Sequence, residues 1–169
     1  MSLVPSVDLK DFTSGDSSRK QKFISEIGQA FEEIGFVALS GHFLSQELVD
    51  DLYYEIKKFF ELEQKIKDSY EIPGIGGQRG YTSFGKEHAK GRKEGDLKEF
   101  WHFGQFVEEN PRLESEYPVN VVVKELPEFN KIGKKTSKML EKTAKYVLRA
   151  LALHLNLEET YFDEFIKNG

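Results

Sequence analysis

Apolar residues recur at helical spacing in three long segments of the chain. The first segment lies between residues 18 and 34, the second follows Ser45, and the third lies between residues 127 and 155. In each segment about one residue in three or four is apolar, which places these side chains on one face of a helix. The second segment aligns Leu48, Leu52, Ile56, Phe59 and Phe60. The pattern predicts three amphipathic helices, with a further helical turn over residues 63–67.

Residues at the ends of these segments have the chemistry of helix caps. Ser18 and Gln21 are spaced as a capping box, in which the two side chains satisfy free backbone N–H groups. Gly35 follows the first segment, where a residue with positive φ is expected. Pro127 suits the first position of the long helix because the N–H that it lacks would have no partner there. Asn156 suits a left-handed cap at the end of that helix.

Short runs of β-prone residues separate the predicted helices. Residues 4–9 alternate between polar and apolar side chains, and Pro5 limits this run to a strand start or an edge strand. Residues 36–39 are apolar throughout, and residues 119–123 are rich in valine. These three runs predict strands.

Glycine and proline interrupt the segment between residues 71 and 95. Loops of this length are uncommon in compact domains unless they serve a function. Aromatic residues return over residues 96–106, and a last short helix is predicted over residues 158–166. Helices with a few short strands predict an α+β fold, and the chain length favours one domain over residues 1–169.

Composition narrows the class of protein. The chain is only 38% hydrophobic, but 14 Phe and 7 Tyr supply large side chains for a core. The net charge of -5 and the lack of a dominant basic stripe argue against nucleic acid as a partner. The absence of Cys excludes disulfides and thiolate metal sites. We find no signal peptide and no apolar run long enough to span a membrane, so we expect a cytoplasmic protein without a membrane partner.

The four histidines do not form a recognisable metal motif. Neither His-x-Asp nor His-Glu-x-x-His occurs, so we expect ordinary structural or surface roles for His42, His88, His102 and His154. If the segment around His102 is extended, its ring faces away from its neighbours Trp101 and Phe103. We predict no metal ligand and no catalytic residue in this chain.

Two further patterns are weaker candidates for chemistry. The glycines over residues 74–80 do not match a phosphate-binding loop, because their spacing is wrong and no strand precedes them. The carboxylates of Glu94, Asp96 and Glu99 alternate with lysines, which is compatible with general acid–base chemistry but favours structural ion pairs. Four lysines before this segment predict a solvated helix face: Lys57, Lys58, Lys65 and Lys67.

The order of the motifs resembles one family as a whole. The chain has an opening strand with Pro5, a Gly-Phe strand leading to Gly41-His42, and then two specific blocks. These blocks are Arg79-Gly80-Tyr81 with Gly85-x-Glu87, and Asp96-Leu97-Lys98-Glu99-Phe100. This order is similar to the N-terminal region of the isopenicillin N synthase-like 2-oxoglutarate/Fe(II) oxygenases. The chain departs from the family in having Gly41 before the histidine.

The resemblance implies that this chain is the N-terminal portion of a longer enzyme. In that family a double-stranded β-helix holds Fe(II) through His-x-Asp and a distant His, and Arg-x-Ser binds 2-oxoglutarate. All of these motifs follow the matched region, so the few strands here would complete the jelly-roll sheet of the full-length oxygenase. We expect Fe(II) and 2-oxoglutarate as cofactors of the parent, which oxidises a small molecule, and neither bound by this chain alone. A parent that dispenses with 2-oxoglutarate, as isopenicillin N synthase does, is the open alternative.

The resemblance also points to substrate-binding residues near the glycine-rich loop. By position they are Gln78, Arg79, Tyr81, Thr82 and Ser83, and Arg79 could bind a substrate carboxylate through two hydrogen bonds. The alternative is a surface ion pair for Arg79 and core packing for Tyr81. For the whole chain, the alternative to an oxygenase fragment is a non-enzymatic helical protein-interaction module; an anion-binding loop is weaker. A fragment would expose strand edges and associate with itself through them.

Overall fold

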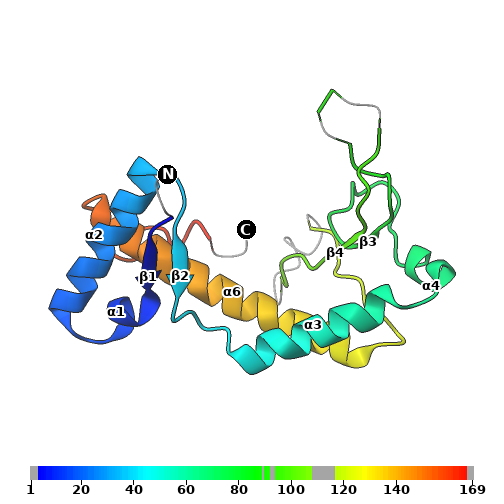
Figure 1. Ribbon diagram of the computed structural model, residues 1–169, viewed down its shortest axis with the longest axis horizontal. Helices are drawn as coiled ribbons and strands as arrows, with labels where there is room; N and C mark the ends of the chain where they lie inside the picture. Colours follow the sequence, from blue (N-terminus) through cyan, green and yellow to red (C-terminus); the bar gives the residue numbers. More distant parts are fainter. Residues whose placement is uncertain (1–3, 89, 92–93, 108–116, 167–169) are drawn as a thin grey trace. The chain divides into compact units, whose positions relative to one another are not determined.

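The computed structural model describes all residues except 1–3, 89, 92–93, 108–116 and 167–169. Helices and short strands are interspersed along the chain, which confirms the predicted α+β class (Figure 1). The chain forms two compact units, one from Met1–Ser45 and Lys138–Lys167 and the other from Gln46–Ser137. The elements are β1 (Ser6–Asp8), α1 (Leu9–Thr13), α2 (Ser17–Glu33), β2 (Ala38–Ser40), α3 (Gln46–Phe60), α4 (Gln64–Asp68), β3 (Gly80–Thr82), β4 (Phe100–His102) and α6 (Pro127–His154).

The first unit packs a parallel pair of strands and two helices around the second half of α6 (Figure 1). β1 pairs with β2 in the register Ser6↔Ala38, Val7↔Leu39 and Asp8↔Ser40. Apolar side chains from β1, α1, α2 and α6 form one buried cluster: Val7, Leu9, Phe12, Phe23, Ile24, Ile27 and Ala150. The predicted strands at residues 4–9 and 36–39 are therefore confirmed, each with bounds shifted by a residue or two.

The ends of α2 show one confirmed cap and one wrong prediction. Asp16, rather than Ser18, is the N-cap residue, and its carboxylate accepts hydrogen bonds from the backbone N–H groups of Ser18 and Arg19. Both residue types cap helices well, so the sequence alone did not decide between them. At the other end, Gly35 adopts a φ of +80° and donates its N–H to the carbonyl of Ala30, as expected for a left-handed cap.

The second unit has an aromatic core. β3 pairs with β4 in antiparallel fashion, and this hairpin packs on α3, α4 and the first turns of α6. Phe59 lies at the centre, with its ring stacked on Phe129 at 5.1 Å and in edge contact with Trp101 at 4.8 Å. The fully or nearly buried members of the cluster are Phe59, Tyr70, Tyr81, Val123, Leu126 and Phe129.

The structure differs from the sequence-based predictions in four local features. α1 was not predicted, and β3 lies inside the segment expected to be a loop. Residues 119–123 do not form a strand, because side-chain amides form hydrogen bonds with the backbone here in place of a partner strand. Asn120 bonds the backbone of Gly104, and Asn130 bonds both backbone groups of Val123. Residues 158–166 form successive turns closed by short-range bonds rather than a helix.

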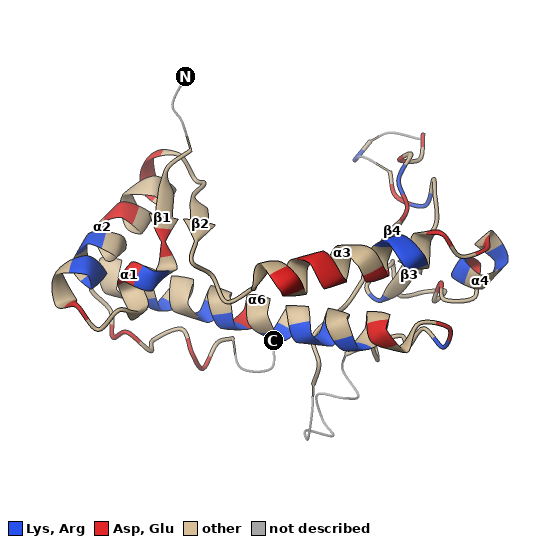
Figure 2. Ribbon diagram, turned by 60° about the horizontal axis from the view of Figure 1, so that its bottom comes forward, with Lys and Arg blue, Asp and Glu red and all other residues tan. Residues whose placement is uncertain are grey.

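The long helix α6 agrees with its prediction at both ends. It begins at Pro127 and ends at His154, and Asn156 follows with a φ of 59°. Basic residues repeat at spacings of three and four along it, so they share one side of the helix (Figure 2): Lys131, Lys135, Lys138, Lys142, Lys145 and Arg149. In the described part of the chain, no helix combines the length and apolar character needed to cross a membrane.

Candidate functional site

The β3–β4 hairpin separates two sets of side chains. Because side chains alternate along a strand, Trp101 faces the aromatic core with Tyr81, its partner in the register. Thr82 and Phe100 are paired on the opposite face, and His102 follows Phe100 on that face. The predicted orientation of His102, away from Trp101 and Phe103, is thus confirmed.

The inner face holds a buried charge network. Lys67 of α4 is 6% exposed and places its Nζ 2.8 Å from Oε2 of Glu99. The hydroxyl of Tyr81 donates to the same Oε2 at 2.5 Å and accepts from the amide of Gln64 at 3.1 Å. Burial raises the pKa of Tyr81 to about 12, and the Glu99 carboxylate adds to the shift. The prediction of a solvated Lys67 is wrong, because its partner is brought to it by a strand 32 residues away.

The outer face carries an ordered histidine. Nδ1 of His102 lies 2.6 Å from the carbonyl oxygen of Gly77, and the imidazole ring packs against Phe100 with centroids 4.7 Å apart. Gly77 has a φ of +72°, and a Cβ there would lie 2.7 Å from Oγ1 of Thr82. The glycine-rich loop can therefore close over Thr82 only with glycine at this position. His102 itself is exposed, although two contacts hold it.

Arg79, which directly precedes β3, is a buried cation. It is 8% exposed, and its guanidinium lies against the Cα of Gly104, where any side chain would overlap it. One terminal nitrogen donates to the carbonyl of Gln78 at 2.7 Å, and Nε has no partner. Among the residues that the structure describes, no carboxylate pairs with Arg79. A buried charge without a counterion is costly, so this group is a candidate for binding an anion.

The other predicted substrate-binding residues lie in or beside β3 and have different environments. The side chain of Gln78 is exposed beside Gly77. Tyr81 and Thr82 are buried, and Oγ1 of Thr82 has no hydrogen-bond partner in the described part of the chain. Ser83 donates its hydroxyl to Glu71 at 2.9 Å. Among the described residues, Gln78, Arg79 and Thr82 therefore keep polar atoms without a partner, and only the Gln78 side chain is exposed.

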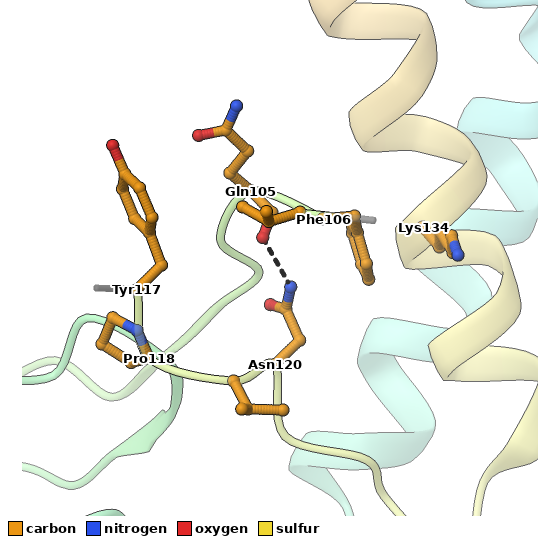
Figure 3. A pocket seen from close by; sticks show the side chains of 8 residues that line it. Gln105, Phe106, Tyr117, Pro118, Asn120 and Lys134 are labelled. Carbon is orange, nitrogen blue, oxygen red and sulfur yellow. Dashed lines mark hydrogen bonds between the residues drawn. The ribbon is translucent and has the colours of Figure 1, made fainter. Parts of the chain in front are cut away.

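A hollow of about 390 Å³ adjoins the segment that follows β4 (Figure 3). Phe106, Pro118 and Val119 form much of its apolar wall, and Lys134 of α6 places its Nζ 5.2 Å from the centre of the Phe106 ring. Asn120 supports the wall by donating to the carbonyl oxygens of Gly104 and Gln105, both at 3.1 Å. This volume matches a small ligand.

The acidic segment around Lys98 contains ion pairs. Lys98 lies between Glu87 at 2.7 Å and Asp96 at 3.4 Å, which confirms the favoured structural interpretation of this acidic segment. Lys93, the other lysine that alternates with carboxylates in this segment, lies outside the described residues. Within the described ranges, no three His, Cys, Asp or Glu side chains converge as a metal site.

Comparison with known proteins gives a consistent family match. A family model described as non-haem dioxygenase in morphine synthesis, N-terminal, matches residues 4–125. A 2-oxoglutarate-dependent dioxygenase from Aspergillus flavus is 36% identical over 85 residues, which cover 50% of this chain and 23% of that protein. A Dictyostelium discoideum protein named as an iron/ascorbate oxidoreductase is 30% identical over 173 residues, covering 94% of this chain and 47% of its own length.

The fold is shared with solved structures of the same type. A crystal structure of a protein assigned to the 2OG-Fe(II) oxygenase family, from Caulobacter crescentus, superposes with a TM-score of 0.83 at 33% sequence identity. The superposition covers 96% of this chain and 52% of that protein. The chain thus spans about half the length, or less, of the relatives that it matches.

Proposed function

The chain belongs to the non-haem dioxygenase family, whose N-terminal region matches residues 4–125, and from this membership we propose that it forms part of an oxygenase that uses Fe(II) and 2-oxoglutarate to oxidise a small molecule. The observation that carries the proposal is the extent of the match. Nearly the whole chain aligns with the Dictyostelium and Caulobacter proteins, and it accounts for only 47% and 52% of their lengths. The catalytic portion would then be supplied by a further stretch of polypeptide.

The sheet of the first unit supports this division. Within the described residues, β1 and β2 form a parallel sheet of two strands, whereas parallel strands usually occur within larger sheets that are covered on both faces. Each strand pairs with the other along one edge and leaves its second edge open among the described residues. We expect strands from the catalytic portion to pair with these edges.

The described residues do not fit an iron site. They include no converging set of three metal-ligating side chains. We therefore assign the binding of Fe(II) and 2-oxoglutarate to residues outside this chain, where they would support oxidation of the substrate. This chain would act in structure and in substrate recognition.

For substrate recognition we assign the segment from Gln78 to Ser83. Arg79 offers a buried guanidinium without a carboxylate partner among the described residues, and a carboxylate on the substrate would complement it. Gln78 adds an exposed amide beside it, whereas the hydroxyl of Ser83 is bonded to Glu71. Tyr81 and Thr82 are buried and would hold the loop rather than touch the substrate.

The test compares the 169-residue chain with the product of the complete reading frame. The frame beyond Gly169 is expected to encode His-x-Asp, a distant His and Arg-x-Ser, and its product to form succinate from 2-oxoglutarate when Fe(II) is added. The 169-residue chain alone is expected to form none. Iron-dependent succinate formation by the chain alone would contradict the division of roles. A stop codon directly after Gly169 would favour a non-enzymatic interaction module instead.

The open edges give a second test. Without the catalytic portion, the edges of β1 and β2 can pair with those of another copy. Light scattering on the 169-residue chain is expected to show self-association that increases with concentration, and the complete protein should show less. A monomer at all concentrations would count against the pairing of further strands with these edges.

A further inference from the structure

His102 is an exposed side chain that is nevertheless held in one orientation. Its ring packs against Phe100 on one side, and Nδ1 lies 2.6 Å from the carbonyl oxygen of Gly77. Exposed side chains usually keep their rotamer freedom and lose it only on binding. A ring that is already fixed avoids that entropy loss, which is the property expected of a recognition group.

The contact with Gly77 also determines which ring nitrogen carries the proton. A carbonyl oxygen can only accept a hydrogen bond, so Nδ1 must be the donor. In the neutral ring Nε2 is then left without a proton and acts as an acceptor. The glycine-rich loop thus presents the Nε2 lone pair of His102 on the outer face of the hairpin.

The surroundings of Nε2 define the ligand that it would suit. Phe100 is half-buried beside the imidazole and gives this face an aromatic surface, and Nζ of Lys98 lies over its ring, 5.4 Å from the centre. The exposed amide of Gln78 follows the anchoring residue Gly77. A polar acceptor next to an aromatic surface matches a small, ring-bearing molecule that carries an N–H or O–H group. None of this requires a metal ion or a cofactor.

The geometry points to His102 as a specificity-determining residue of the substrate site: its Nε2 accepts a hydrogen bond from an N–H or O–H donor on an aromatic substrate that packs on Phe100. This inference rests on the proposed function, because it identifies the outer face of the hairpin with the substrate side of the oxygenase. It adds an acceptor to the anion-binding role proposed for Arg79. The two groups would recognise different parts of one molecule.

The inference is tested with two probes that differ at the ring nitrogen, where one carries a hydrogen-bond donor and the other carries a methyl group. Indole offers an aromatic N–H, and 1-methylindole has the same ring system without the donor. Binding to the 169-residue chain is followed by NMR, using the side-chain nitrogen signals of His102. We expect indole to bind roughly two- to tenfold more tightly than 1-methylindole and to shift the Nε2 signal, because one hydrogen bond contributes about that ratio.

Two substitutions separate recognition from a structural role. In His102→Asn the amide nitrogen can still donate to Gly77, but no acceptor remains at the place of Nε2. In His102→Gln an amide oxygen can reach that place, although the anchor is weakened. We expect His102→Asn to keep the fold and lose the preference for indole, and His102→Gln to keep part of the preference.

Several outcomes would overturn the inference. They are equal binding of the two probes, retention of the preference in His102→Asn, and lack of saturable binding of either probe. The measurement uses neither iron nor 2-oxoglutarate. Its failure is therefore distinguishable from failure of the proposed function, which the succinate assay tests.

Discussion

The buried pair of Lys67 and Glu99 gives the sharpest test of how the second unit is stabilised. The side chains are 7% and 17% exposed, and their charged atoms are 2.8 Å apart. Replacing Lys67 with Met keeps the length of the side chain and removes its charge. Glu99 then keeps only its hydrogen bond from Tyr81. Breaking a buried pair in this way costs about 3–5 kcal/mol.

We expect Lys67→Met to lower the free energy of unfolding by about 3 kcal/mol, at the low end of that range because Glu99 retains some solvent contact. The double variant Lys67→Met/Glu99→Gln should recover much of this loss. In this variant the amide oxygen that replaces the Glu99 carboxylate still accepts from the Tyr81 hydroxyl, and no unpaired charge remains. We therefore expect the free energy of unfolding to be lower than that of the unsubstituted chain by about 1 kcal/mol.

Urea unfolding followed by tryptophan fluorescence measures these changes. The chain has one Trp, and Trp101 packs against the same aromatic cluster, so its emission reports on this unit. Lys65→Met is the matched control, because Lys65 is exposed on the same short helix, and it should change stability by less than about 0.5 kcal/mol. Equal effects of Lys67→Met and Lys65→Met would refute the reasoning, as would a double variant less stable than Lys67→Met alone.

Three further predictions concern pH and backbone geometry. The pKa of Tyr81 is raised to about 12, so the protonated hydroxyl contributes fully to stability below the ordinary tyrosine pKa near 10, and this contribution is lost as the pH rises toward 12. Tyr81→Phe should reduce this alkaline loss of stability in urea titrations carried out at several pH values. Hydrogen bonding from Arg149 lowers the pKa of Asp163 to about 2, so this carboxylate stabilises the first unit above pH 3.8 and ceases to do so as the pH falls toward 2. Acid unfolding followed by circular dichroism should therefore depend less steeply on pH in Asp163→Asn. Gly80 has a φ of +76°, and a Cβ there would lie 2.6 Å from the carbonyl oxygen of Tyr70. Gly80→Ala should therefore lower the melting temperature by several degrees. An unchanged melting temperature would show that the strand can shift.

Much of the helical structure could be predicted because its determinants are local. The period of apolar residues, Pro127 at one end and Asn156 at the other define α6 within a continuous stretch of sequence. Gly35 likewise marks the end of α2 by its own backbone preference. Local signals failed where two residues of similar capacity compete, as Asp16 and Ser18 do for the N-cap position.

The short strands could be predicted only in part, because their pairing is determined by distant residues. Val119 to Val123 has the composition of a strand, yet Asn130 binds both backbone groups of Val123 and leaves them no strand partner. β3 forms in a glycine-rich segment because residues after 99 pair with it. Composition reports the preference of a segment, whereas the partner decides whether a strand forms.

The candidate site shows the same division between local and distant determinants. The alternation of side chains over residues 100–103 correctly predicts that His102 faces away from the aromatic core, since this depends on the strand alone. The proton position on His102 depends on the carbonyl of Gly77, 25 residues earlier, and the buried state of Lys67 depends on Glu99, 32 residues later. Neither contact can be read from a local sequence pattern, because each joins residues that are far apart in the chain. Because the chemistry of both groups follows from those contacts, the residue types could be identified from the sequence, but their roles required the fold.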